Sequence, residues 1–319
     1  MEITFLTPYA ALFALAAFVP LAVFRGRERR VRRVRGALRL DEPPRRSRLS
    51  LAGTLAAVCV LFALAAAQPV VATTRVLPER TDAQVFVVLD TSRSMIASAE
   101  PGAPTRFQRA RALAVALRDD LPEVPMGIAS ITSGLLPHLF PTTDRRVFLA
   151  TSEDSVDIER PPPNYGATVA TALDALASAP TKNYFAPSAQ KRVLVVLTDG
   201  ETRPIELDLA GAFRKKPRID TVFVRLWDAD ERIYLTGVAE VGYRPDPASG
   251  DMLARIASMI DGRIVPEEEA GGLGRVVGDL LGSGPTTGRE HEGRRRALMP
   301  WITLAAFLPL GFVLRRRNL

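Results

Sequence analysis

Runs of apolar residues alternate with amphipathic segments along the middle of the chain. Three near-continuous apolar runs, Val85–Leu89, Val193–Leu197 and Thr221–Trp227, have the length and β-branched content of strands buried on both faces. Met126–Thr132 is a fourth candidate strand, expected near the middle of the sheet. Because buried strands of this kind occur in parallel sheets, helices are expected to cover both faces.

Amphipathic helices are predicted between these strands. Thr105-Arg106-Phe107-Gln108 fits a capping box, and apolar residues recur on one face after it. Similar patterns predict helices at 168–179, 252–260 and 273–281. This alternation predicts an α/β fold, a doubly wound and mostly parallel sheet of Rossmann-like type.

Three longer apolar stretches, Ile3–Phe24, Leu49–Ala67 and Ala297–Leu314, contain no charged residue. About 17 to 25 such residues cross a bilayer as a helix, so all three are predicted to be transmembrane. The predicted order is helix 1–24, basic cytoplasmic loop 25–48, helix 49–68, connector 69–82, α/β domain 83–282, linker 283–296, helix 297–314 and cytoplasmic tail 315–319.

Charge is divided unevenly between these segments. Residues 25–48 contain eleven arginines and three acidic residues, a net charge of +8, whereas the whole chain carries +7. The basic balance therefore belongs to one loop, and nucleic-acid binding by the α/β domain is not expected. Short basic loops stay in the cytoplasm, which places the domain on the outer, periplasmic or extracellular, face of the cell membrane. Arg294–Arg296 would then flank the third helix on the outer side, against the rule.

The basic loop has three possible roles: a topology signal, contact with anionic lipid head groups, or contact with a partner protein. Cys59 is the only cysteine, so no intramolecular disulfide can stabilise the α/β domain.

Oxygen-bearing side chains follow two of the predicted strands. Asp90, Ser92 and Ser94 come directly after Val85–Leu89, and Asp199 follows Val193–Leu197. Thr168 stands at the predicted start of a helix. The carboxyl ends of parallel strands meet in one crevice, and oxygen ligands suit a hard divalent cation. Taken singly, Asp199 could be a turn residue and Thr168 only a helix N-cap.

The run Asp-x-Ser-x-Ser after a strand, a later Gly-x-Thr and a strand ending in Thr-Asp-Gly resemble the metal-ion-dependent adhesion site of von Willebrand factor A domains. The resemblance implies Mg²⁺, with Mn²⁺ or Ca²⁺ as alternatives. It also implies direct contact of the ion with the three hydroxyls, and contact of Asp90 and Asp199 through water. A carboxylate from a partner protein would complete the coordination. Arg93 stands where many relatives have glycine; its cation could favour an acidic partner or simply face solvent.

The order of segments resembles membrane-anchored bacterial proteins of the Bat (aerotolerance) type. Asp251–Ala257 and Gly262-Arg263-Ile264 are similar to that family's closing helix and strand. The resemblance implies a stress-tolerance complex with other membrane von Willebrand A proteins and a MoxR-type AAA+ ATPase. A cytoplasmic ATPase could meet only the basic loop, since the domain is predicted outside.

Two other functions stay open. A Mg²⁺-dependent phosphohydrolase of the haloacid dehalogenase type also carries Asp after its first strand, but that family needs a second Asp two residues later, where this chain has Ser92. His138 and His291 are the only histidines, and no GxxxxGK[ST] loop is present. An enzyme is therefore not expected. The third possibility is a structural subunit with a vestigial metal site.

Overall fold

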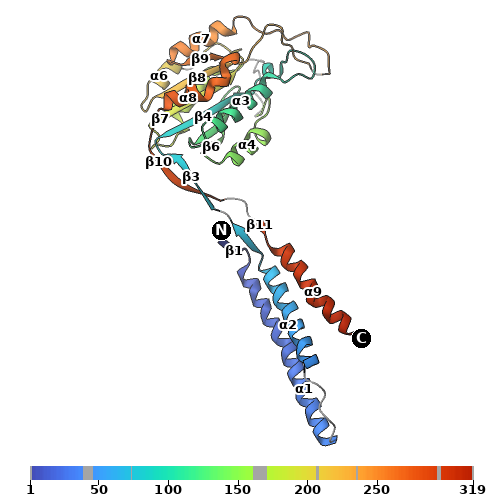
Figure 1. The fold of residues 1–319 in the computed structure, drawn as a ribbon. Helices are drawn as coiled ribbons and strands as arrows, with labels where there is room; N and C mark the ends of the chain where they lie inside the picture. Colours follow the sequence, from blue (N-terminus) through green and yellow to red (C-terminus); the bar gives the residue numbers. More distant parts are fainter. Residues whose placement is uncertain are drawn as a thin grey trace. The chain divides into compact units, whose positions relative to one another are not determined.

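The computed structural model describes residues 2–38, 46–72, 74–160, 171–205, 208–234, 236–292 and 296–317. The chain divides into two compact units (Figure 1). Unit 2 comprises residues 77–289 and contains the central sheet, while unit 1 comprises residues 1–76 and 290–319 and contains the long apolar helices. The predicted site residue Thr168 lies outside the described residues.

The central sheet of unit 2 has six strands in the order β6-β5-β4-β7-β8-β9. Their bounds are β4 Ala83–Asp90, β5 Met126–Ile131, β6 Leu135–Thr142, β7 Lys191–Thr198, β8 Ile219–Arg225 and β9 Arg263–Pro266. All neighbouring pairs are parallel except β5 and β6, which are antiparallel. The predicted mostly parallel sheet is confirmed. The strand predicted at Met126–Thr132 is β5, which is second from the edge of the sheet and not at its middle, because β6 is the edge strand beside it.

Helices cover both faces of this sheet, as a doubly wound fold requires. One face packs against α3 Arg106–Asp120, α4 Arg145–Asp154 and α8 Leu273–Leu281. The other packs against the 3-10 helix η3 Leu173–Ala177 and the helices α5 Ser178–Thr181, α6 Leu209–Phe213 and α7 Ser249–Met259. Successive residues of β4 alternate between the two cores: Val85, Val87 and Leu89 face the first, Phe86 and Val88 the second. Because its side chains contribute to both cores, β4 is buried between the two helical layers of unit 2.

The predicted helices differ in how well their starts were placed. The capping box at Thr105 is present, because the Thr105 hydroxyl accepts from the Gln108 N–H and the Gln108 side chain accepts from the Thr105 N–H. Residues 168–170 of the helix predicted at 168–179 lie outside the described residues, and the prediction is wrong at the next two positions: Thr171 forms an isolated bridge with Thr202, and the 3-10 helix η3 begins at Leu173. The backbone N–H of Thr171 donates to the Glu201 carbonyl instead of entering a helix.

The segments predicted only as a connector and a linker form strands. β2 Pro69–Ala72 pairs with β1 Glu2–Phe5 and with β11 Arg296–Ala297, both antiparallel, and β3 Thr74–Arg80 pairs with β10 Thr286–Glu292. Two short 3-10 helices, η2 Arg93–Ile96 and η4 Glu267–Gly272, complete unit 2. β-Branched residues before the α/β domain, such as Val70, Val71 and Thr74, favour the extended conformation.

Unit 1 contains the 3-10 helix η1 Pro8–Ala17 and the helices α1 Phe18–Leu38, α2 Arg46–Ala66 and α9 Met299–Arg317. The basic segment predicted as a loop from residue 25 is helical as far as Leu38. Arginine has high helix propensity, and seven arginines in this part do not interrupt the helix.

Helices lie at all three predicted transmembrane positions, but within the described residues one is long and apolar enough to cross a bilayer, Pro8–Val34. The apolar parts of the other two are shorter, Gly53–Ala66 and Met299–Arg315. Of the three predicted spans, one is therefore found as a candidate in the part of the chain that the structure describes.

Candidate metal centre

Two aspartates meet at the carboxyl ends of the central strands. Asp90 is the last residue of β4, and Asp199 directly follows β7. The two strands are parallel neighbours, with Leu89 paired to Leu197, so both carboxylates arrive at the same edge of the sheet. Both residues have no exposed surface. Two buried carboxylates this close repel each other unless a positive charge lies near them.

The Asp90 carboxylate is held by three donors. Its Oδ1 accepts from the Ser92 N–H at 2.9 Å and from the Thr171 hydroxyl at 2.6 Å. Its Oδ2 accepts from the Thr198 hydroxyl at 2.6 Å. Because both oxygens are engaged, the carboxylate is fixed in orientation and has little freedom to swing toward a bound ion.

Ser92 and Ser94 lie on the turn that leads from β4 into η2. Their hydroxyl oxygens are 3.0 Å apart, and both residues are buried. Ser94 also makes a side-chain hydrogen bond to Asp199. The structure thus brings together four of the five predicted site residues, Asp90, Ser92, Ser94 and Asp199. Their role as metal ligands stays a prediction.

Burial first, and the negative charge of Asp199 second, raise the pKa of Asp90 from 3.8 to about 7, although the hydrogen bonds that the carboxylate accepts oppose this rise. Burial also raises the pKa of Asp199, although the charge of Arg106 opposes this. A divalent cation would relieve both effects. Within the described residues no group of three or more His, Cys, Asp or Glu side chains could hold a metal ion. The donor set is therefore hydroxyls with two carboxylates, which fits a hard cation such as Mg²⁺.

Thr171 is the hydroxyl that the sequence prediction missed in this part of the chain. It follows Thr168 by three residues and donates to Asp90 from a fully buried position. The Gly-x-Thr pattern pointed only to Thr168, whose placement the structure does not describe. A second threonine so close in the same segment was the available signal.

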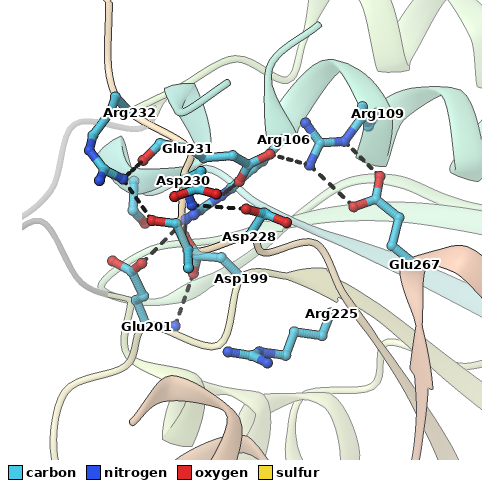
Figure 2. Close-up of polar contacts among 12 residues, drawn as sticks. Arg106, Arg109, Asp199, Glu201, Arg225, Asp228, Asp230, Glu231, Arg232 and Glu267 are labelled. Carbon is cyan, nitrogen blue, oxygen red and sulfur yellow. Dashed lines mark hydrogen bonds and ion pairs between the residues drawn. The ribbon is translucent and has the colours of Figure 1, made fainter. Parts of the chain in front are cut away.

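A buried arginine lies behind the two carboxylates and was also missed as a site residue. Arg106, the first residue of α3, has no exposed surface. Its Nη1 donates to Asp199 Oδ2 at 2.9 Å, to Glu201 Oε1 at 3.3 Å and to the Tyr243 hydroxyl at 2.8 Å. Its Nε donates to Glu231 Oε2 at 2.5 Å. Figure 2 shows this network, with Arg109 linked to Glu231 and Glu267 beside it.

Burial by itself lowers the pKa of the Arg106 guanidinium, but the surrounding acids, first of all Asp199, raise it above its usual range. Arg106 is therefore a permanent positive charge next to Asp199. The burial of this arginine could not be predicted from the sequence, because an arginine at the start of a helix is ordinarily exposed.

Comparison with known proteins identifies this arrangement. A family model described as von Willebrand factor type A domain matches residues 85–201, which run from β4 through the residue after the Asp199-Gly200 turn. Residues 85–201 are thus similar to von Willebrand factor type A domains. No curated protein sequence matches the chain.

Solved structures similar to the chain come from several organisms. The conserved hypothetical protein BatB from Bacteroides thetaiotaomicron is 20% identical, covers 63% of this chain and 100% of its own, and has a TM-score of 0.51. An aerotolerance-related membrane protein from Bacteroides fragilis NCTC 9343 is 20% identical, with coverages of 62% and 98% and a TM-score of 0.49. Proximal thread matrix protein 1 from the mussel byssus, with a zinc-occupied adhesion-site motif, is 15% identical, with coverages of 64% and 49% and a TM-score of 0.41. At these identities BatB supports the fold alone.

Two side chains near the von Willebrand A site have partners that the sequence did not indicate. Arg93, expected either to face solvent or to favour an acidic partner, pairs with Glu240 at 2.8 Å. His138 lies in β6 with its Nε2 2.7 Å from the Ser130 hydroxyl, and burial lowers its pKa. Ser92, where a phosphohydrolase of the haloacid dehalogenase type would need an acid, bonds to Ser94.

Proposed function

We propose that this protein is an interaction module whose von Willebrand A domain binds an acidic residue of a partner protein through a divalent cation, Mg²⁺ in the cell. The observation that carries the proposal is the pair of fully buried carboxylates, Asp90 and Asp199, with the hydroxyls of Ser92 and Ser94 beside them. Arg106 offsets the charge of Asp199, whereas the described groups that hold Asp90 are neutral donors, so a bound cation would offset the remaining buried charge. Thr168 stays a predicted fifth ligand.

The chain's residues divide the work between direct contact and support. The Ser92 and Ser94 hydroxyls are neutral ligands, so they bind an ion without cancelling its charge. Both oxygens of Asp90 are already engaged by protein donors, which favours contact through water. When bound, the cation supplies a positive charge and an open coordination position for an incoming carboxylate.

Membrane attachment is the second part of the proposal. The candidate span Pro8–Val34 carries exposed apolar side chains such as Leu12, Phe13 and Phe18, each more than half exposed in the protein alone. Lipid would cover them, since a soluble surface rarely presents such a run. The shorter apolar helices α2 and α9 are proposed as further spans, with the von Willebrand A domain on the outer face and the arginines before Leu38 in the cytoplasm.

The cellular setting rests on resemblance. We propose a membrane complex of the Bat type with other von Willebrand A proteins, linked to a MoxR-type ATPase and to stress tolerance. With the domain outside, the cytoplasmic ATPase would contact the basic end of α1. Lipid head groups are the alternative partner for those arginines.

Calorimetric titration of the full chain in detergent micelles with MgCl₂ and MnCl₂ tests the proposal. The wild type is expected to bind one ion, and Asp90→Asn should weaken binding by about tenfold or more, equal to about 1.4 kcal/mol. Asp220→Asn is the matched control, because Asp220 is an exposed aspartate at the opposite end of the same sheet, paired in register with Val193. Absence of binding by the wild type at millimolar metal, with or without acetate, would refute a metal-dependent module and support a vestigial site.

A further inference from the structure

The buried guanidinium of Arg106 lies where it can control how the metal site uses Asp199. Among its neighbours only Asp199 belongs to the predicted metal site; Glu201, Glu231 and Tyr243 do not. Its other terminal nitrogen, Nη2, is buried and has no hydrogen-bond partner among the described residues. Hydrogen bonds to Glu201, Glu231 and Tyr243 therefore orient the guanidinium toward Asp199, and one of its donor nitrogens stays unused.

Both oxygens of Asp199 are occupied by protein donors. Oδ2 accepts from Arg106 at 2.9 Å, and Oδ1 accepts from the Glu201 N–H at 2.9 Å. A carboxylate engaged on both sides is held back from direct coordination, and its charge is shared with a cation of the protein. In the part of the chain that the structure describes, Asp90 has no such cation; the groups that hold it there are two hydroxyls and one N–H. The two aspartates would therefore differ in the negative charge that each offers to a bound ion, with Asp90 offering more than Asp199.

We propose that Arg106 is a positioning residue that sets the affinity of the site for an acidic ligand. It holds Asp199 in the outer shell and offsets its charge, so that a bound divalent cation keeps more of its own charge for the carboxylate of a partner. The cost is weaker binding of the cation by itself, because like charges lie near each other. This inference rests on the proposed metal-dependent function.

Substitutions that separate charge from geometry test the role. Arg106→Gln keeps an amide that can donate to Asp199 but removes the charge; Arg106→Lys keeps the charge on a different side chain. Arg109→Gln is the matched control, since Arg109 lies one turn further along α3 and shares Glu231, at 2.7 Å, but does not contact Asp199. Circular dichroism and thermal melting check that each full-length variant folds in detergent.

Two quantities are measured for each folded variant: Mn²⁺ affinity by calorimetry, and the factor by which saturating acetate, a carboxylate probe, strengthens it. Arg106→Gln should bind Mn²⁺ about tenfold more tightly than the wild type and lose most of the acetate effect. Arg106→Lys should recover wild-type behaviour on both counts, and Arg109→Gln should stay within about threefold of the wild type. A purely structural arginine would instead weaken Mn²⁺ binding in both Arg106 variants.

The outcomes separate this inference from the proposed function. If the wild type binds Mn²⁺ but Arg106→Gln binds it equally or more weakly, Arg106 has no such role while the metal site stands. If the wild type binds no ion, the proposed function itself fails. Should Arg106→Gln not fold, a wild-type crystal soaked in Mn²⁺ decides: Asp199 reaching the ion through water supports the inference, and direct Asp199 coordination overturns it.

Discussion

Replacing Asp90 by asparagine should make the metal-free protein more stable, although it removes a central residue of the site. Asp90 has no exposed surface, and its pKa rises from 3.8 to about 7, first because of burial and second because of Asp199. Above that pH the carboxylate is forced to ionise inside the protein. An asparagine of the same shape carries no charge and keeps an acceptor for the Ser92 N–H and the Thr171 hydroxyl.

The magnitude follows from the pKa. Each unit corresponds to about 1.4 kcal/mol, so the buried charge destabilises the metal-free fold by on the order of 4 kcal/mol at alkaline pH. The new amide must face the Thr198 hydroxyl, which already accepts from the Gly200 N–H. That hydroxyl must turn its proton elsewhere, which offsets part of the gain. We expect a net stabilisation of about 1 to 3 kcal/mol in Asp90→Asn.

Urea denaturation at about pH 8, with chelator and then with saturating Mg²⁺, measures the effect. The wild type should be the less stable protein with chelator and should gain stability with Mg²⁺, whereas Asp90→Asn should not respond to Mg²⁺. Asp220→Asn should follow the wild type in both conditions. The reasoning is refuted if Asp90→Asn is less stable than the wild type in chelator, or if both respond equally to Mg²⁺.

Two further predictions concern pH and the start of α3. Since the folded pKa of Asp90 lies above its unfolded value, its contribution to the stability of the metal-free protein is fully present below 3.8 and is lost as pH rises to about 7. Mg²⁺ should consequently raise the melting temperature more at about pH 8 than at about pH 5; an equal or opposite dependence would show that Asp90 does not ionise on binding. Thr105→Ala breaks the capping box and should cost about 1 kcal/mol in chemical denaturation. A loss below about 0.3 kcal/mol would mean that packing alone fixes the helix start.

The sequence predicted the sheet well because its strands are buried on both faces. A run such as Val85–Leu89 has no polar position, and a covered parallel strand explains that. The edge strand β6 was missed since its exposure alternates irregularly and two prolines, Pro137 and Pro141, interrupt it. Proline is tolerated there because an edge strand leaves one side without sheet partners.

The candidate site was predictable only for residues that lie close together in the sequence or directly follow neighbouring strands. Asp90, Ser92 and Ser94 share one turn, and Asp199 follows a strand of the same type, so the sheet topology was enough to unite them. Arg106, Glu231 and Tyr243 come together through contacts across more than a hundred residues. Nothing in their local patterns distinguishes them from surface side chains, which is why the buried network became visible only in three dimensions.

The membrane segments were located by their composition. Apolar residues without charges marked the position of each long helix of unit 1. Within the described residues, Pro8–Val34 is the helix found long and apolar enough to cross a bilayer, so fewer candidate spans are found than were predicted.

Anomalous diffraction from crystals of the full-length protein soaked in Mn²⁺ tests the central claim most directly. The account predicts one strong manganese peak at the carboxyl ends of β4 and β7, in contact with the Ser92 and Ser94 hydroxyls and near both Asp90 and Asp199. That peak should be absent from Asp90→Asn crystals. No peak at this edge in the wild type, or a peak elsewhere on the molecule, would contradict the account.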